Sequence, residues 1–317
     1  MVQLPAWNAI EEDLRVGLVL VADACRYIVG MGKRGDAAAS AILGIKNVPE
    51  QHLDDLIRDR EFLSKVKISD TSFAACARRC FDLVTVLGPI EQINVEDEKV
   101  EGTQWLSYFL SFMPREALGG RDYTGTFHGS DAPLVILLGM AEARLALAEY
   151  AQNFVRESDS GTGFTPKEIA FLGDVDVRTV RNAMGPKGDK PIRSNAKPKA
   201  DEARSDLVLG DPLDALEWLA GRRGFHPGRL SPEWVNQHLT GVKSRDAAAA
   251  LPGLVAWLNR ITTEQLASSL GWPADRVRKW TRAHTIEVNA AEQVAAAAGL
   301  NVTAYRDLIA RVAGSGR

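Results

Sequence analysis

Apolar residues recur about every 3.6 positions through most of the chain, the spacing of one buried helix face. Strand-like alternation is nearly absent before residue 157, so the first half predicts a series of helices. Their ranges are Trp7 to Ile28, His52 to Leu63, Thr71 to Val86, Gln104 to Met113 and Ala132 to Arg156. The last range is long and strongly apolar, which suits either a core helix or a dimer seam with Leu134 to Tyr150 as the candidate contact.

Two later breaks in the helical pattern suggest domain boundaries. Ser158 to Gly163 is a short polar link rich in serine and glycine, a composition typical of flexible connections. Phe225 to Pro232 contains two prolines and a glycine, after which helical spacing resumes to the end of the chain. We therefore expect two or three domains.

The segment after the first break begins with several helix-start signals. Thr165 can cap a helix, Pro166 suits its first turn, and Glu168 stands where a capping box requires an acidic or amide side chain. Phe164 and Ile169 have the spacing of a hydrophobic staple. A well-defined helix is predicted to begin here.

A helix-turn-helix requires a small residue where its helices cross, a tight turn four residues later, and a branched apolar residue inside the second helix. Ala170, Asp174 and Val180 hold these places. Asp174 replaces the usual glycine, and aspartate tolerates a left-handed backbone better than most residues. Asp176 can cap the second helix, whose exposed side would carry hydrogen-bond donors suited to guanine, adenine and phosphate. These candidate DNA-contacting residues are Arg178, Thr179, Arg181 and Asn182.

A basic stretch rich in glycine and proline follows. Residues 178–204 carry eight Lys and Arg against three acidic residues, a bias that favours contact with phosphate. The stretch predicts a small β-hairpin, a short strand at Leu207 to Leu209, and a helix that starts at Asp211 and Pro212. The candidate phosphate contacts are Lys187, Lys190, Arg193, Lys197 and Lys199.

This order of helix, turn, helix, basic hairpin, strand and helix resembles the winged helix-turn-helix of phage excisionases and MerR-type regulators over about residues 163–224. The resemblance implies that the second helix enters the major groove and that the hairpin wing contacts the DNA backbone or minor groove. The long, Lys-rich wing departs from the compact hairpin of the family. Small three-helix units also serve as protein-binding modules, so a binding role without DNA stays open.

A second segment repeats the same spacing near the carboxyl end. Thr262 and Gln265 can form a capping box, and Ala267, Gly271 and Val277 hold the crossing, turn and inner-helix places. The candidate DNA-contacting residues here are Arg276, Arg278, Lys279 and Arg282.

The second segment resembles the five-helix domain of the lambda-repressor or Cro type over about residues 251–313. The resemblance implies DNA contact by the third helix of the five. Pro273 and Ala274 stand where that family is expected to carry polar residues that contact bases. Ala-rich helices also pack against proteins, so a purely structural role for this domain stays open.

Charge is distributed unevenly along the 317 residues, although the formal net charge is only −3. Residues 1–160 carry 16 basic and 24 acidic residues, net −8, whereas the remaining residues carry 22 and 17, net +5. Three cysteines, Cys25, Cys76 and Cys80, suit a reducing compartment. We expect a cytoplasmic protein, with no membrane span, metal site, cofactor or catalytic residue.

Together these patterns predict an all-α, multi-domain protein with a small β-hairpin wing in a central winged helix-turn-helix. The expected parts are an acidic dimerisation or regulatory domain (1–157), the DNA-binding domain (163–224) and a repressor-like domain (232–317). The expected function is sequence-specific binding of double-stranded DNA for transcriptional regulation, as a homodimer and with RNA polymerase or another regulator as a further partner. The alternatives are an architectural factor for recombination, plasmid maintenance or phage packaging, and a protein-interaction scaffold.

Overall fold

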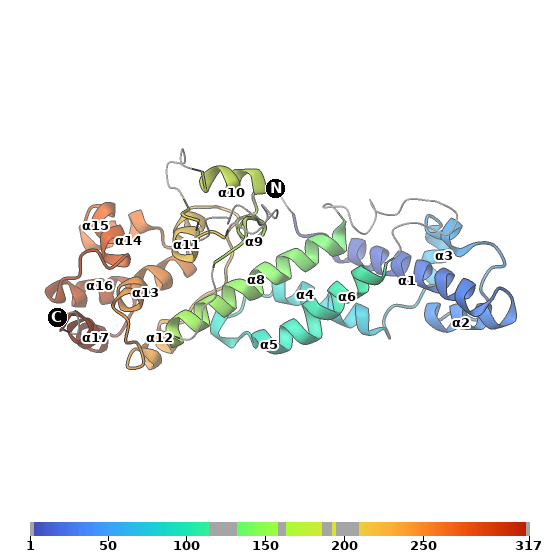
Figure 1. Cartoon of the computed structure of the whole chain (residues 1–317), viewed down its shortest axis with the longest axis horizontal. Coiled ribbons are helices and arrows are strands. Elements are labelled where there is room, and N and C mark those ends of the chain that lie inside the picture. Colours follow the sequence, from blue (N-terminus) through green and yellow to red (C-terminus); the bar gives the residue numbers. More distant parts are fainter. Residues whose placement is uncertain (1–2, 114–131, 158–162, 186–191, 195–208, 315–317) are drawn as a thin grey trace, which may run out of the picture. The chain divides into compact units, whose positions relative to one another are not determined.

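The fold is almost entirely helical in the computed structural model, which describes residues 3–113, 132–157, 163–185, 192–194 and 209–314 (Figure 1). Within these ranges the β contacts are isolated bridges, which join Phe164 and Ser194 to Gly210 and Pro89 to Arg229. The prediction of an all-α protein is confirmed. Within the same ranges, none of the helices combines the length and the apolar character that a bilayer crossing requires.

The chain divides into two compact units. The smaller unit contains residues 3–85 and 96–142, and the larger unit contains residues 1–2, 86–95 and 143–317. The predicted DNA-binding and repressor-like parts, residues 163–224 and 232–317, therefore both lie in the larger unit.

The smaller unit is built from helices of unequal length. They are α1 Trp7–Val29, α2 Lys33–Leu43, η1 Leu53–Leu56, α3 Arg60–Lys65, α4 Ser72–Thr85, α5 Val95–Glu98, the π-helical η3 Lys99–Gln104, α6 Trp105–Phe112 and the beginning of α8 Pro133–Arg156. The predicted ranges are confirmed to within two residues for α1, α4, α6 and α8, whereas α2 was not predicted.

The helix predicted from His52 to Leu63 is wrong, because the chain breaks into η1 and α3. Asp59 has an extended backbone and its side chain accepts hydrogen bonds from the N–H groups of Glu61 and Phe62. An aspartate in this position caps a new helix rather than continuing an old one. The apolar spacing alone did not reveal this cap.

The core of the smaller unit draws side chains from most of its helices, and α1 and α6 both contribute to it. A Cβ atom added to Gly17 would lie 2.8 Å from Cζ of Phe109, so the two helices approach each other closely there. Cys76 and Cys80 are buried and unbonded on α4, and burial raises the pKa of the Cys80 thiol to about 12. These thiols therefore serve as small core side chains.

Helix α8 contributes to the core of both units. Leu134 and Leu137 are fully buried in the smaller unit, and Leu147 and Tyr150 are buried in the larger one. The candidate dimer seam from Leu134 to Tyr150 is therefore largely occupied by contacts within the chain, and the alternative of a core helix is confirmed.

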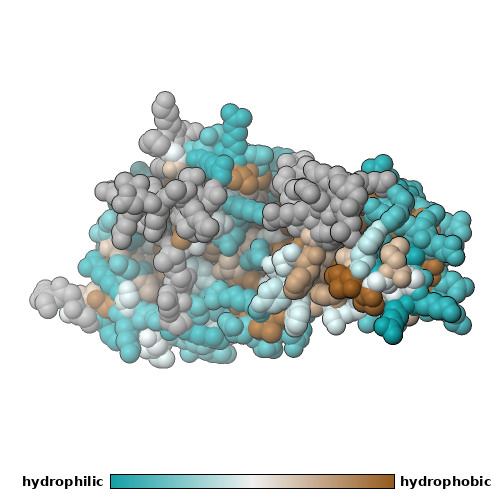
Figure 2. Space-filling model, turned by 45° about the vertical axis from the view of Figure 1, so that its right-hand side comes forward, coloured by the Kyte–Doolittle hydropathy of each residue, from teal (hydrophilic) through white to brown (hydrophobic). Residues whose placement is uncertain are grey.

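The surface of the smaller unit carries several exposed hydrophobic side chains. Trp105, Tyr108 and Phe112 lie three and four residues apart on α6 and are 45 to 76% exposed. The space-filling view shows hydrophobic side chains among a mainly hydrophilic surface (Figure 2). Residues at this spacing share one helix face, so α6 presents an aromatic stripe.

The larger unit contains the remaining helices. They are η2 Ile90–Gln92, the rest of α8, α9 Pro166–Gly173, α10 Val177–Ala183, α11 Pro212–Ala220, α12 Pro232–His238, α13 Arg245–Leu258, α14 Thr263–Leu270, α15 Ala274–Thr281, η5 Val288–Ala290, α16 Ala291–Ala298 and α17 Val302–Gly314. The five helices expected in the repressor-like domain are α13 to α17.

A polar chain inside the larger unit joins three of these helices. The Nε1 atom of Trp280 on α15 donates to the Tyr305 hydroxyl of α17 at 3.2 Å, and that hydroxyl donates to the Ala248 carbonyl of α13 at 3.0 Å. Burial raises the pKa of Tyr305, so its hydroxyl stays neutral. Buried aromatic groups with satisfied polar atoms fix how helices pack.

Most of the predicted β-hairpin wing, including the first two residues of the strand at Leu207 to Leu209, falls on residues 186–191 and 195–208, which lie outside the described residues. Its described flanks contain a single antiparallel bridge between Ser194 and Gly210. The Asp211 N–H also donates to the Arg193 carbonyl at 2.6 Å. The hairpin itself is therefore not supported by the described residues.

Candidate nucleic-acid interface

Helix α9 begins with the predicted capping box. The Thr165 hydroxyl accepts a hydrogen bond from the Glu168 N–H at 3.2 Å, and the Glu168 carboxylate accepts one from the Thr165 N–H at 2.7 Å. Phe164, directly before the cap, is buried. Because the two bonds satisfy otherwise free N–H groups, the start of the helix is fixed locally.

The turn after α9 has the geometry that the sequence predicted. Asp174 has left-handed backbone angles, φ 47° and ψ 50°, and the Val175 N–H donates to the Ala170 carbonyl at 3.1 Å. Ala170 and Val180 are both buried, as a helix crossing requires. The α9–α10 pair therefore forms a helix-turn-helix.

Helix α10 presents a polar face to solvent. The Asp176 carboxylate caps it by accepting the Arg178 N–H at 2.7 Å. The four predicted contact residues on this helix, Arg178, Thr179, Arg181 and Asn182, are all exposed. Neither arginine forms an ion pair with a carboxylate of the described residues, so both guanidinium groups are available to a ligand.

The predicted wing contacts divide into two groups. Lys187, Lys190, Lys197 and Lys199 lie outside the described residues. Arg193 is described, and its Nε lies 2.6 Å from Oδ2 of Asp214 on α11 although its side chain is 61% exposed. The hydrogen bond that its guanidinium donates to the Asp214 carboxylate raises the pKa of Arg193. Its Nη2 atom also donates to Oδ1 of Asp214 at 3.3 Å and lies 3.7 Å from Asp211, so the positive charge of Arg193 is compensated within the protein.

The α14–α15 pair repeats the design of the α9–α10 pair. Thr262 and Gln265 form a capping box, Gly271 has left-handed angles of φ 65° and ψ 27°, and the Trp272 N–H donates to the Ala267 carbonyl at 2.9 Å. Ala267 and Val277 are buried at the crossing. The predicted second helix-turn-helix is therefore present as a structural unit.

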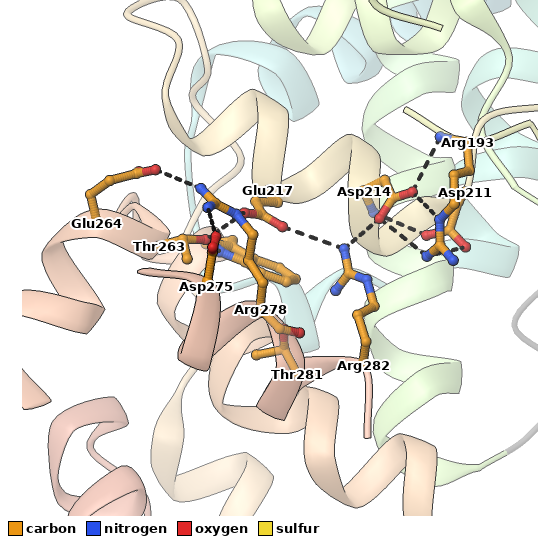
Figure 3. A network of polar contacts seen from close by, with 11 residues as sticks. Arg193, Asp211, Asp214, Glu217, Thr263, Glu264, Asp275, Arg278, Thr281 and Arg282 are labelled. Carbon is orange, nitrogen blue, oxygen red and sulfur yellow. Dashed lines mark hydrogen bonds and ion pairs between the residues drawn. The ribbon is translucent and has the colours of Figure 1, made fainter. Parts of the chain in front are cut away.

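Two arginines, Arg278 of α15 and Arg282 directly after it, meet carboxylates of α11 (Figure 3). Arg278 Nε lies 2.7 Å from Glu217 Oε1, and its other nitrogens pair with Glu264 and Asp275. Directly after α15, Arg282 is 14% exposed and pairs with Asp214 at 2.5 Å and with Glu217 at 3.4 Å. Both arginines thus hold α15 against the central helix α11.

The ionisation of Asp214 reflects this network. Burial by itself would raise the pKa of the carboxyl, but hydrogen bonds and positive charge from Arg193 and Arg282 outweigh burial and hold the pKa below its usual value. Asp214 is therefore charged at neutral pH and permanently paired. The positive charge of Arg282 is compensated within the protein.

The other two predicted contacts of the second pair differ from each other. Arg276 pairs with Glu287 at 2.7 Å, and its guanidinium lies 4.0 Å from the centre of the Trp272 ring. Lys279 is exposed and has no ion pair with a carboxylate in the part of the chain that the structure describes. Of the four candidates here, only Lys279 keeps an uncompensated charge among the described contacts.

Two features of this site were not predicted. Asp214 and Glu217 act as partners of Arg278 and Arg282, although only the tertiary packing of α11 and α15 brings them together. Arg222 and Arg223, in the loop after α11, are exposed next to the first helix-turn-helix. The doublet between two glycines was visible in the sequence, but its position beside the turn was not.

Comparison with protein-family models found no match, and searches of curated proteins and of solved structures found none either. Among the described residues, no three His, Cys, Asp or Glu side chains gather as metal ligands. Function is therefore inferred from the geometry and charge of the helix-turn-helix units.

Proposed function

We propose that the protein binds double-stranded DNA sequence-specifically through α10 and acts as a transcriptional regulator. The observation that carries this proposal is the capped, exposed face of Arg178, Thr179, Arg181 and Asn182, whose arginines are not ion-paired within the described residues. Arginine donates two hydrogen bonds to guanine and asparagine pairs with adenine in the major groove. Arg178, Arg181 and Asn182 contact base edges in this mechanism.

The proposed DNA-binding domain has the winged form of excisionases and MerR-type regulators. The predicted wing lies outside the described residues apart from its flanks, where Ser194 and Gly210 form an isolated antiparallel bridge. The lysines of this wing contact phosphates and add sequence-independent affinity.

In this proposal the second helix-turn-helix has a structural role: it packs against α11 and does not contact DNA. Arg278 and Arg282 form ion pairs with carboxylates of α11. If these two side chains contacted DNA instead, Glu217 and Asp214 would lose these partners. A buried carboxylate without its partner is strongly unfavourable. Each chain therefore has one recognition helix, and a homodimer supplies the second half-site. This favours a regulator over an architectural factor that bridges DNA with two unlike units of one chain.

Selection from random duplex DNA tests the proposal. The purified protein is incubated with the pool at moderate salt, and the bound duplexes are sequenced. The expected result is one enriched motif that disappears in the Arg178→Ala/Arg181→Ala variant and persists in a control, Lys243→Ala/Arg245→Ala, which removes two exposed charges before and at the start of α13. Binding without a motif would favour an architectural factor, and no binding would favour a protein-interaction scaffold.

A further inference from the structure

The loop that follows α11 packs directly against the turn of the first helix-turn-helix. A Cβ atom added to Gly224 would lie 2.5 Å from Cβ of Asp174 and 2.7 Å from the Gly173 carbonyl oxygen. A Cβ added to Gly173 would in turn lie 2.9 Å from a methyl group of Leu219. Both glycines are therefore required by close approach, and residues 221–225 are held beside the turn.

This loop carries two adjacent arginines. The Arg222 guanidinium lies 4.0 Å from the centre of the Trp218 ring, and the Arg222 N–H donates to the Leu219 carbonyl at 2.8 Å. Stacking on tryptophan orients a guanidinium without neutralising its charge. Arg223 is exposed, and neither arginine forms an ion pair with a carboxylate in the described ranges. Two uncompensated positive charges therefore stand beside the turn.

We infer that Arg222 and Arg223 contact DNA phosphates at the edge of the groove that α10 enters. In a bound helix-turn-helix, the first helix crosses the DNA backbone and the amino-terminal residues of the second contact base edges. The turn between α9 and α10 consequently lies near the phosphates that flank the groove. The packing of Gly224 on Gly173 and Asp174 brings both arginines to that position.

The inference rests on the proposed function and goes beyond the recognition helix and wing. Phosphate contacts supply affinity for every sequence, whereas base contacts supply preference for one. The arginine pair and α10 therefore have separable roles, and removal of the pair weakens binding without changing the preferred motif.

The test measures the affinity of the full chain for its selected duplex and for a scrambled duplex across a range of potassium chloride concentrations. The variants are Arg222→Gln/Arg223→Gln, the charge-preserving Arg222→Lys/Arg223→Lys, and the control Lys243→Ala/Arg245→Ala. For the glutamine variant we expect a roughly tenfold or greater loss on both duplexes. The slope of log affinity against log salt should become shallower by about 1.8, because each lost phosphate contact contributes about 0.9.

The lysine variant should retain the wild-type slope, and the control should retain both slope and affinity. An unchanged slope in the glutamine variant would overturn the inference, as would a changed motif. Failure of the wild-type protein to select any motif would instead overturn the proposed function. Circular dichroism and thermal unfolding of each variant separate loss of contact from loss of fold.

Discussion

Arg278 Nε lies 2.7 Å from Oε1 of Glu217, and this contact joins the second helix of one helix-turn-helix to the helix that supports the other. Glu217 is 13% exposed, also accepts from the Thr263 hydroxyl at 2.9 Å, and lies 3.4 Å from Arg282. One carboxylate thus compensates two arginines. Through these contacts Glu217 links α11 to α15.

Glu217→Gln should destabilise the larger unit. The substitution keeps the shape of the side chain but leaves two partly buried guanidinium groups without full compensation, at a cost of about 2 kcal/mol. Urea unfolding followed by tryptophan fluorescence measures the change. Glu292→Gln is the matched control, because its pair with Arg306 is exposed on both sides and should contribute much less to stability. Equal effects of the two substitutions would refute the structural role of Glu217.

Lys279→Ala should leave both affinity and sequence preference unchanged. In the proposed arrangement α15 packs against α11 and does not enter a DNA groove. Lys279 therefore stays in contact with solvent when DNA is bound. Arg181→Ala should relax the preference at one base and cost about 1 to 3 kcal/mol on the selected duplex. Fluorescence anisotropy with both variants compares them directly. A loss of preference in the Lys279 variant would show that the second helix-turn-helix also contacts bases.

Asp174→Gly should stabilise the protein by roughly 0.5 to 1 kcal/mol. Asp174 has a left-handed backbone, and its buried Oδ1 atom lacks a hydrogen-bond partner among the described residues. The reciprocal control is Gly271→Asp at the equivalent turn, where open space surrounds the position and only the backbone opposes a side chain. That substitution should lower stability by about 1 kcal/mol. Thermal unfolding measures both variants. A shift of the melting temperature in the same direction for the two variants would contradict the prediction.

Asp13→Asn should stabilise the smaller unit at neutral pH. Burial raises the pKa of Asp13 from 3.8 to about 6, although its carboxylate accepts the Leu134 N–H at 3.3 Å. Between pH 3.8 and 6 the Asp13 carboxyl is therefore protonated to a larger extent in the folded protein than in the unfolded chain. As the pH falls through this range, proton binding to Asp13 increases the free energy of unfolding. The amide removes the penalty of the buried charge, about 1 to 3 kcal/mol.

Unfolding of wild type and Asp13→Asn across that pH range measures this difference. The stability gain should be largest above pH 6 and should shrink toward pH 3.8. Glu50→Gln serves as the control, because Glu50 is exposed in the smaller unit and should change stability by less than about 0.5 kcal/mol throughout. A gain that is independent of pH would exclude titration of Asp13 as its cause.

Local features of the site could be predicted from the sequence. The capping boxes at Thr165 and Thr262 and the turns at Asp174 and Gly271 are present as expected. Each is formed by groups within five residues of one another, so residue type and spacing suffice to specify it. The break at Asp59 was missed because a cap inside an apolar pattern competes with helical spacing.

The state of the basic residues could not be predicted in this way. Arg181 and Arg278 stand at equivalent positions, each directly after the buried valine of its helix, yet the first is exposed and the second is bound to Glu217. The Arg278 partner lies 61 residues away in the chain, and only packing of α11 against the carboxyl-terminal helices brings it within bonding distance. Hydrophobic spacing indicates which face of a helix is polar. It does not indicate which charged side chains of other helices form ion pairs with that face.

The sequence by itself therefore determined most of the helices, the two capping boxes and the two helix-turn-helix units, because short-range hydrogen bonds and apolar spacing specify them. The tertiary structure decided which of α10 and α15 keeps its arginines exposed and which side chains surround each turn. Those outcomes depend on burial and on ion pairs between residues far apart in sequence, as for Arg282 with Asp214 and Gly224 with Asp174.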